Sequence, residues 1–258
     1  MKVDKLRTVI IYIIIILLGL VCLLPLLNIV AISFSSSAAV EGNMVGLIPV
    51  GFSTAAYKKI LEDSQFWHSF LISVERVVLA LIINFVLIVL MAYPLSKTNA
   101  QFRGRNIYAN LMIFAMLFNG GMIPTFLVVK SYGLLNTVWA LVLPGAVPIF
   151  NVILVMNFFA AVPKELEEAA FIDGANPLQV LTKIFIPISK PVLATVSLFS
   201  IVGSWNDFYS GLIYMSKAAY YPLMTYIQSL QINVEDLIKQ GNLSAVVDSA
   251  SLGNTNLN

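Results

Sequence analysis

The run from Val9 to Leu27 places 19 consecutive residues without a charged side chain near the start of the chain. An α-helix rises about 1.5 Å per residue, so a run of this length crosses roughly 30 Å of hydrocarbon. Three basic residues precede it (Lys2, Lys5 and Arg7), as in a secretory signal peptide. The apolar core of a signal peptide has only about 7–15 residues, however. We therefore interpret this run as a retained transmembrane helix, with a cleaved signal peptide as the alternative.

Four more apolar segments follow, near residues 71–95, 107–129, 137–160 and 192–215. Charged residues make up 11% of the chain and the mean hydropathy is +0.89, whereas a soluble domain is about 25% charged. A soluble enzyme, a disordered tail and a fibrous protein are thereby excluded. The sequence predicts an all-α, polytopic transmembrane helical bundle that forms a single domain over residues 1–258. Prolines inside the third and fourth segments indicate kinked or broken helices.

Basic residues orient such a bundle, because cytoplasmic segments carry an excess of Lys and Arg. With the N-terminus inside, the inner segments hold nine basic residues and the outer segments five. We therefore expect a multi-pass protein of the bacterial cell membrane with its N-terminus in the cytoplasm. Residues 161–191 then lie on the cytoplasmic side, and residues 217–258 form an extracytoplasmic segment.

The loop over residues 161–191 has the pattern of two short helices. Pro163 suits the start of a helix, and the acidic residues that follow it favour a first turn. Gly174 suits the left-handed position that ends a helix. Pro177 can open the second helix, and we expect Pro187 to end it. Apolar residues recur along both helices, so this loop is predicted to dock on another protein or on the base of the bundle.

The same loop resembles the coupling loop of binding-protein-dependent ABC importer permeases. The family pattern is Glu-Ala-Ala, three residues, Gly, nine residues, Ile, any residue, Leu, Pro. This chain has Glu168-Ala169-Ala170, Gly174, Ile184 and Pro187 in register, with Ile186 in place of Leu. The resemblance implies contact with an ATPase through these residues: Glu165, Glu168, Ala169, Ala170, Asp173, Gly174, Ala175, Ile184 and Pro187.

Two further segments are similar to the carbohydrate branch of that family, the maltose-type and lipoprotein-associated polysaccharide importers. They are residues 121–140 and the run Trp205-Asn206-Asp207-Phe208. The resemblance implies the second permease subunit of an oligosaccharide importer. The implied partners are a related permease in a heterodimer, two cytoplasmic ATPase subunits and an extracytoplasmic sugar-binding protein. Permeases of this kind have six spans, so we expect a sixth span beyond the five visible here.

We expect no bound cofactor, no metal site and no catalytic residue in this chain. A phosphate-binding loop needs a Gly-Lys pair, and none occurs. ATP and Mg²⁺ are expected in the partner ATPase subunits. One Cys and one His are too few for a zinc site of the usual Cys and His ligands, and a net charge of +2 without a basic stripe argues against nucleic acid.

The substrate pathway is expected near polar residues inside the spans, because hydroxyl and amide groups bind sugars and aromatic rings cover them. The candidates are Asn119, Trp205, Asn206, Asp207 and Tyr209. An ionisable group within a span indicates a functional site, which singles out Asp207. Arg76 lies near the outer end of the second span, and we expect its long side chain to reach outward to the membrane surface.

Two other function classes remain as alternatives. A secondary transporter or channel that is not driven by ATP would need inverted repeats and carboxylates at the midplane, and no repeat is visible. An intramembrane enzyme would need a pair of catalytic groups. Neither alternative explains the coupling-loop pattern.

Overall fold

The computed structural model describes the backbone of residues 2–118 and 120–239, and the side chains of residues 7–118 and 120–231. Every regular element within these residues is helical, which confirms the all-α prediction. The chain divides into two compact units, one ending at Phe66 and the other beginning at Trp67. Of the predicted extracytoplasmic segment 217–258, residues 240–258 lie outside the described residues.

The first unit contains three helices before the boundary: α1 (Lys2–Ser33), α2 (Ser37–Glu41) and α3 (Ala55–Glu62). The loop after α1 folds back on itself, since the Ser53 N–H donates to the Phe34 carbonyl over 2.9 Å. The ring of Phe34 also stacks on Phe52 at 5.7 Å. Large apolar side chains are exposed along α1 from Val9 to Val30, as expected of a helix whose surroundings are lipid or another apolar chain.

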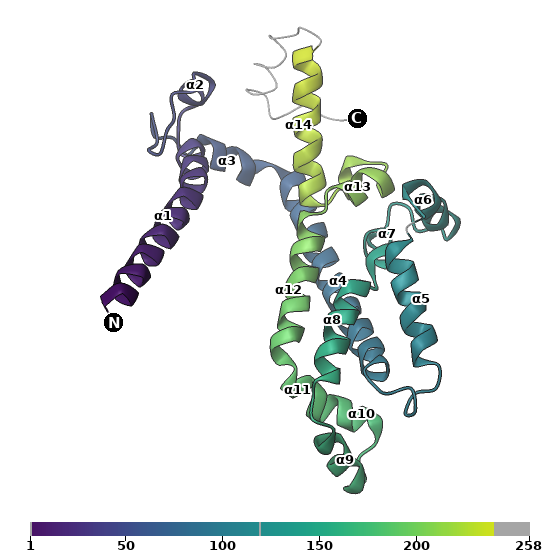
Figure 1. Ribbon diagram of the computed structural model, residues 1–258. Helices are drawn as coiled ribbons and strands as arrows, with labels where there is room; N and C mark the ends of the chain where they lie inside the picture. Colours follow the sequence, from purple (N-terminus) through teal and green to yellow (C-terminus); the bar gives the residue numbers. More distant parts are fainter. Residues whose placement is uncertain (1, 119, 240–258) are drawn as a thin grey trace. The chain divides into compact units, whose positions relative to one another are not determined.

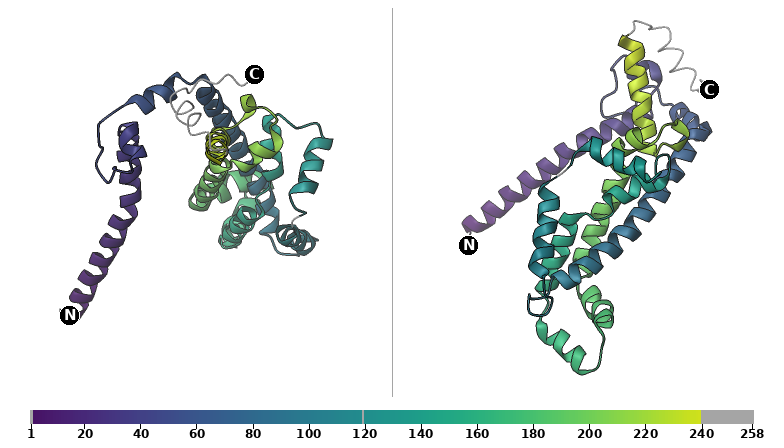
Figure 2. Two further views of the ribbon diagram at one scale, coloured as in Figure 1. Left: turned by 90° about the horizontal axis from the view of Figure 1, so that it is seen from above. Right: turned by 90° about the vertical axis from the view of Figure 1, so that its right-hand side faces the viewer.

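The second unit is built around three neighbouring helices. Its elements are α4 (Ser64–Leu95, beginning just before the boundary), α5 (Arg105–Leu117), α6 (Met122–Ser131), α7 (Val138–Val142), η1 (Leu143–Gly145), α8 (Ile149–Ala160), α9 (Lys164–Ile172), α10 (Pro177–Val180), η2 (Leu181–Phe185), α11 (Ile186–Ile188), α12 (Lys190–Asn206), α13 (Tyr209–Tyr214), η3 (Ala218–Tyr220) and α14 (Leu223–Lys239). Helices α4, α8 and α12 run side by side, as Figures 1 and 2 show. Helices α9 to α11 lie at one end of this bundle, and α13 and α14 lie at the other.

The core of this unit lies between α4, α8 and α12. Small and β-branched side chains allow close approach of the helices there, among them Ala92 of α4, Val152 of α8 and Val196 of α12, each nearly inaccessible to solvent. Phe185 of η2 and Phe159 of α8 extend the same core to the end near α9. The loop over residues 161–191 is therefore packed onto the bundle base, as one of the two expected arrangements.

Among the described residues, two helices are long and apolar enough to cross a membrane unbroken, Arg7–Ser33 and Ser64–Leu95. Three further pairs qualify if each bent pair counts as one span, which gives up to five within the described residues. The pair α5 and α6 is bent by 112°, and the segment Val138–Gly145 meets α8 at 48°. The predicted third and fourth spans are thus broken helices. The break in the fourth lies at Pro144 and Pro148, whereas Pro124 lies inside α6, after the break in the third.

The predicted fifth span, residues 192–215, is also interrupted. Helix α12 ends at Asn206, and Asp207 is extended, with φ −76° and ψ 100°. A short helix, α13, then begins at Tyr209. Asp207 therefore lies at a break between two helices rather than within a continuous span.

Candidate functional site

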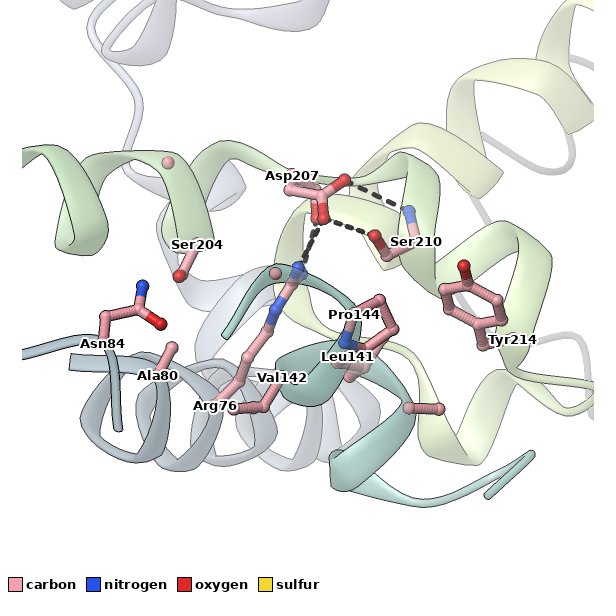
Figure 3. A pocket seen from close by; sticks show the side chains of 13 residues that line it. Arg76, Ala80, Asn84, Leu141, Val142, Pro144, Ser204, Asp207, Ser210 and Tyr214 are labelled. Atoms are coloured by element: carbon pink, nitrogen blue, oxygen red, sulfur yellow. Dashed lines mark hydrogen bonds and ion pairs between the residues drawn. The ribbon is translucent and has the colours of Figure 1, made fainter. Parts of the chain in front are cut away.

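A cavity of about 200 Å³ lies in the second unit, next to the break between α12 and α13 (Figure 3). The walls come from α4, from α7 and η1, and from α12 and α13. Its polar lining includes Arg76, Asn84, Ser204, Asp207 and Ser210, and its apolar lining includes Leu141, Val142 and Pro144. The carboxylate in this wall belongs to Asp207, which lies at the break directly after the last residue of α12.

Arg76 and Asp207 form an ion pair at this cavity. The Arg76 guanidinium contacts the Asp207 carboxylate and donates a second hydrogen bond to the Asp207 backbone carbonyl over 2.8 Å. Ser210 adds two donors to the same carboxylate, its hydroxyl at 2.5 Å and its backbone N–H at 3.1 Å. Among the described residues, the buried Nε of Arg76 has no partner. The site thus holds one spare donor beside a neutralised charge pair.

The prediction that Arg76 reaches outward was wrong. Arg76 is only 3% exposed, because a carboxylate and a carbonyl lie within its reach inside the bundle. A charged group buried with hydrogen-bonding partners is held in place, whereas removal of one partner would leave an isolated buried charge.

The other candidates for the substrate pathway differ in position. Asp207 lines the cavity, and Trp205, Asn206 and Tyr209 do not. Trp205 packs edge-on against Phe70 of α4 at 6.0 Å, and the Asn206 amide bonds its own helix at Val202. The Tyr209 hydroxyl lies 2.8 Å from the sulfur of Met122. Asn119 lies outside the described residues.

The second site is the loop over residues 161–191, where α9 presents an exposed face. Gly174 follows α9 with φ +81°, which confirms the left-handed position expected there. Asn176 and Gln179 form a reciprocal capping box at the start of α10, which fixes the second helix after the turn. The helical segment that Pro177 opens ends at Ile188, one residue beyond the predicted end at Pro187. The chain turns at Ser189 before α12 begins.

The coupling residues predicted from the motif divide into an exposed and a packed group. The exposed group is Glu165, Glu168, Ala169, Asp173, Gly174 and Pro187. The packed group is Ala170, Ala175 and Ile184, which contact the core at the bundle base. Next to the exposed group, Ile172 is 86% exposed and Leu166 and Phe171 are also exposed. One side of the loop is therefore open and partly apolar, and the other side is fixed to the bundle.

Behind the exposed face lies a cluster that we call the base cluster, formed by Tyr93, Lys97, Phe159, Glu167 and Phe185. The Lys97 ammonium lies 2.7 Å from the Glu167 carboxylate. It also lies over the rings of Tyr93 and Phe185, at 4.1 and 4.2 Å from their centroids. Phe185 packs edge-on against both Tyr93 and Phe159. The base cluster thus joins side chains of α4, α8, α9 and η2 with Lys97, which lies two residues beyond the end of α4.

Burial lowers the pKa of Lys97 from its ordinary value, and the hydrogen bond from the ammonium to Glu167 opposes that shift only in part. The side chains of Lys97 and Glu167 are 12% and 10% exposed. The loss of hydration therefore outweighs the attraction within the pair. No group of three or more Cys, His, Asp or Glu side chains suited to a metal ion occurs in the described part of the chain.

The comparison with known families identifies the chain. Residues 71–247 match the family of binding-protein-dependent transport system inner membrane components. The chain belongs to this family. As an inner membrane component of such a system, it is a permease subunit, and the coupling-loop resemblance noted in its sequence is confirmed at the level of the family.

Two relatives of this permease from Bacillus subtilis (strain 168) cover most of its length. It is 44% identical to Protein LplC over 83% of this chain and 72% of the relative. It is 39% identical to the polygalacturonan/rhamnogalacturonan transport system permease protein YtcP over 93% of this chain and 83% of the relative. A solved bacterial ABC transporter involved in the import of the acidic polysaccharide alginate matches its structure with a TM-score of 0.81. That match has 34% identity, over 89% of this chain and 81% of the other.

Sequence reasoning missed several residues of the two sites, Arg76, Asn84, Ser204, Ser210 and Lys97, and it missed the pairing of Lys97 with Glu167. Their partners are far away in the sequence, 131 residues for Arg76 and Asp207 and 70 for Lys97 and Glu167. A buried charge inside an apolar segment was the one available signal, and it applied to Arg76.

Proposed function

We propose that this permease is one half of the translocation pathway of an ATP-driven importer for oligosaccharides. A related permease would form the other half, two cytoplasmic ATPase subunits would supply energy, and an extracytoplasmic binding protein would deliver the sugar. ATP and Mg²⁺ would bind to the ATPase subunits, and this chain would perform no chemical step. The exposed face of α9 carries the proposal, because it presents the motif of the family on a surface with no covering in the described chain.

The ATPase contact is proposed at the exposed side of the loop. Leu166, Phe171 and Ile172 supply apolar surface there, and Glu165, Glu168 and Asp173 supply charge at its edge. Interfaces of moderate size are stabilised by a few apolar anchors within a polar rim. The packed side, through Ala170, Ala175 and Ile184, would then pass the movement of the ATPase to the bundle.

The orientation follows from the same contact. The ATPase subunits are cytoplasmic, so the loop at residues 161–191 must be cytoplasmic as well. If α5 with α6, and Val138–Gly145 with α8, each form one span, four spans separate the N-terminus from this loop, and an even number returns the chain to the same side. The N-terminus is then inside, in agreement with the distribution of basic residues.

The cargo is proposed to be an oligosaccharide because relatives that span most of this chain include a transporter of polygalacturonan and rhamnogalacturonan. The structural neighbour takes part in alginate import. The cavity beside Asp207 offers hydroxyl, carboxylate and guanidinium groups, and hydroxyl-rich sugars can exchange hydrogen bonds with all three. We place the Arg76–Asp207 cavity on the substrate pathway, in contact with the part formed by the second permease.

ATPase stimulation tests this function. The complete complex would be reconstituted in proteoliposomes with its binding protein and supplied with neutral and uronate oligosaccharides. Stimulation by at least one of them supports the proposal. Stimulation by another solute class, with no response to any oligosaccharide, would show that the cargo is wrong. Solute uptake without an ATPase subunit in the complex would favour a secondary transporter.

A further inference from the structure

The base cluster joins α9 to the end of α4 without a covalent link. Glu167 belongs to α9, and Lys97 lies two residues beyond the end of α4. The Tyr93 hydroxyl in the last turns of α4 donates to the same carboxylate over 3.4 Å. Phe185, which lies in the π-helical turn η2, covers the other side of the ammonium. A π-helical turn is rare and is frequent at functional sites.

A contribution to the stability of the fold does not by itself explain why Lys97 and Glu167 form a buried ion pair. Replacement of a buried ion pair by apolar side chains of similar volume is often neutral or stabilising. The apolar contacts of Phe159, Phe185 and Val162 already pack the same region. The pKa of Lys97 is lowered, so its charged form is less favoured at this position than it is in water. The pair fixes where α9 lies against α4, which apolar packing specifies less strictly.

Helix α4 extends from the base cluster to the cavity. The 20 residues from Arg76 to Leu95 form one uninterrupted helical segment, and the two ends lie roughly 28 Å apart at a rise of 1.5 Å per residue. Arg76 binds Asp207 at that distant end. Asp207 itself follows α12, whose start meets the segment Pro177–Ile188 at 84°. Both sides of the ion pair at the cavity are therefore connected to the loop at residues 161–191, α12 through the chain and α4 through Lys97 and Glu167.

We infer that Lys97 and Glu167 are positioning residues that pass the movement of α9 to α4 and so to the Arg76–Asp207 cavity. This inference rests on the proposed contact between α9 and an ATPase. Without the ion pair, α9 can move while α4 stays in place. With the ion pair, a movement of the loop at residues 161–191 displaces α4 and α12 together. Arg76 and Asp207 at the cavity then shift with these helices.

The test measures the cavity directly and does not depend on the cargo. In a Cys22→Ser background, Ser204→Cys places a thiol in the cavity wall. The full complex with its ATPase is treated with a small methanethiosulfonate reagent, once without nucleotide and once trapped with ATP and vanadate. The ratio of the two labelling rates measures how much the nucleotide state of the ATPase changes the accessibility of the cavity. Sugar is absent throughout.

The key variant is the double change Lys97→Met with Glu167→Gln, which removes both charges and leaves no isolated one. If the pair only stabilises the fold, this variant should respond to nucleotide like its parent. We expect instead that its unfolding temperature stays near that of the parent and that the labelling ratio moves toward one. Mutations along coupling routes change responses by between about twofold and 30-fold.

The matched control removes an exposed ion pair. Lys58 and Glu62 lie 3.9 Å apart on α3, with side chains 78% and 68% exposed, and Lys58→Met with Glu62→Gln should leave the labelling ratio unchanged. Lys97→Arg keeps the charge and the ring contacts and should retain most of the response. If the double variant fails to assemble, Glu167→Asp serves in its place, because it withdraws the carboxylate from the ammonium by one methylene.

An unchanged labelling ratio in the double variant, or in an assembled Glu167→Asp complex, overturns the inference. So does a parent complex whose cavity labelling does not respond to nucleotide. These results are separate from the cargo question. A complex that couples nucleotide to the cavity but responds to no oligosaccharide would contradict the proposed cargo and leave the role of Lys97 and Glu167 intact.

Discussion

Gly174 is the residue at which backbone conformation and proposed coupling meet. Its φ of +81° is in the left-handed region, and an added Cβ would meet no atom within 4 Å. The effect of a side chain is therefore conformational strain alone, about 1–2 kcal/mol for an ordinary L-residue. We expect Gly174→Val to reduce ATP-driven uptake, because the turn after α9 would shift the exposed face of the loop.

Co-purification of the ATPase and the rate of uptake measure this effect together. Asn tolerates the left-handed region better than Val, so Gly174→Asn is the matched control and should keep most of the uptake. The idea fails if Gly174→Val transports normally, or if Asn and Val at this position have equal effects.

Arg76 and Asp207 provide a second prediction for single residues. Removal of one member of a buried, hydrogen-bonded ion pair costs about 3–5 kcal/mol, because the other charge remains buried alone. Arg76→Met should therefore lower the thermal unfolding temperature of the purified complex. Arg76→Met combined with Asp207→Asn should restore part of the loss. A double variant no more stable than Arg76→Met would show that the ion pair is not what holds this region.

These residues also show where prediction from sequence ends. An arginine in an apolar segment can reach the membrane surface or find a partner inside, and the segment around Arg76 looks the same in both cases. Whether Arg76 is buried depends on Asp207, which is 131 residues away in the sequence. Glu168 and Gly174 were accessible to prediction because their spacing within one loop is itself the signal.

Among the elements, α13 and α14 approach each other closely at Gly211. A Cβ on Gly211 would lie 2.1 Å from the Thr225 hydroxyl oxygen. Thr225 is fully buried and donates to the Phe208 carbonyl over 2.8 Å, so it has no room to move. Gly211→Ala should destabilise the complex by about 1–3 kcal/mol through overpacking.

Thermal unfolding with Gly19→Ala as control checks this prediction. Gly19 lies in α1 with nothing within 4 Å of an added Cβ, so the control should leave the unfolding temperature unchanged or slightly higher. Equal behaviour of the two variants would mean that α13 and α14 do not approach so closely in the assembled complex.

Helix α9 permits a test of its exposed face. Ile172 is 86% exposed and contributes little to the packing of this chain, so Ile172→Asn should leave stability unchanged. As an apolar anchor of an ATPase contact it should weaken ATPase binding by about 1–2 kcal/mol. Ile48→Asn, at a residue 75% exposed in the first unit, is the control. ATPase retained equally by both variants would remove Ile172 from the contact.

The helix breaks show why elements are only partly predictable. A span is recognised from the mean hydropathy of about 19 residues, and a break changes that mean very little. Gly121 with φ +88° starts α6 after the bend, and Asp207 ends α12, yet both lie in segments apolar enough to pass as one span. Pro187 shows what a local signal can predict, because the helical segment Pro177–Ile188 ends one residue beyond it.

At the scale of the whole molecule, composition predicted the environment and the fold class reliably. A chain with 11% charged residues cannot cover a surface that faces water, and α1 indeed exposes large apolar side chains along its length. Composition says nothing of which charges are buried. Lys97, Glu167 and Arg76 are all charged residues that the fold withdraws from solvent, and each is placed by long-range packing.

The orientation of the chain can be measured with single cysteines in a Cys22→Ser background. Lys58 and Arg103 are exposed and lie on opposite sides of α4 in the sequence, so one span separates them. With the N-terminus inside, an impermeant maleimide should label Lys58→Cys in intact cells and Arg103→Cys only after permeabilisation. Two further spans place residues 161–191 on the same side as Arg103. The opposite labelling pattern would put that loop outside, where no cytoplasmic ATPase can reach it, and would contradict both the orientation and the proposed energy source.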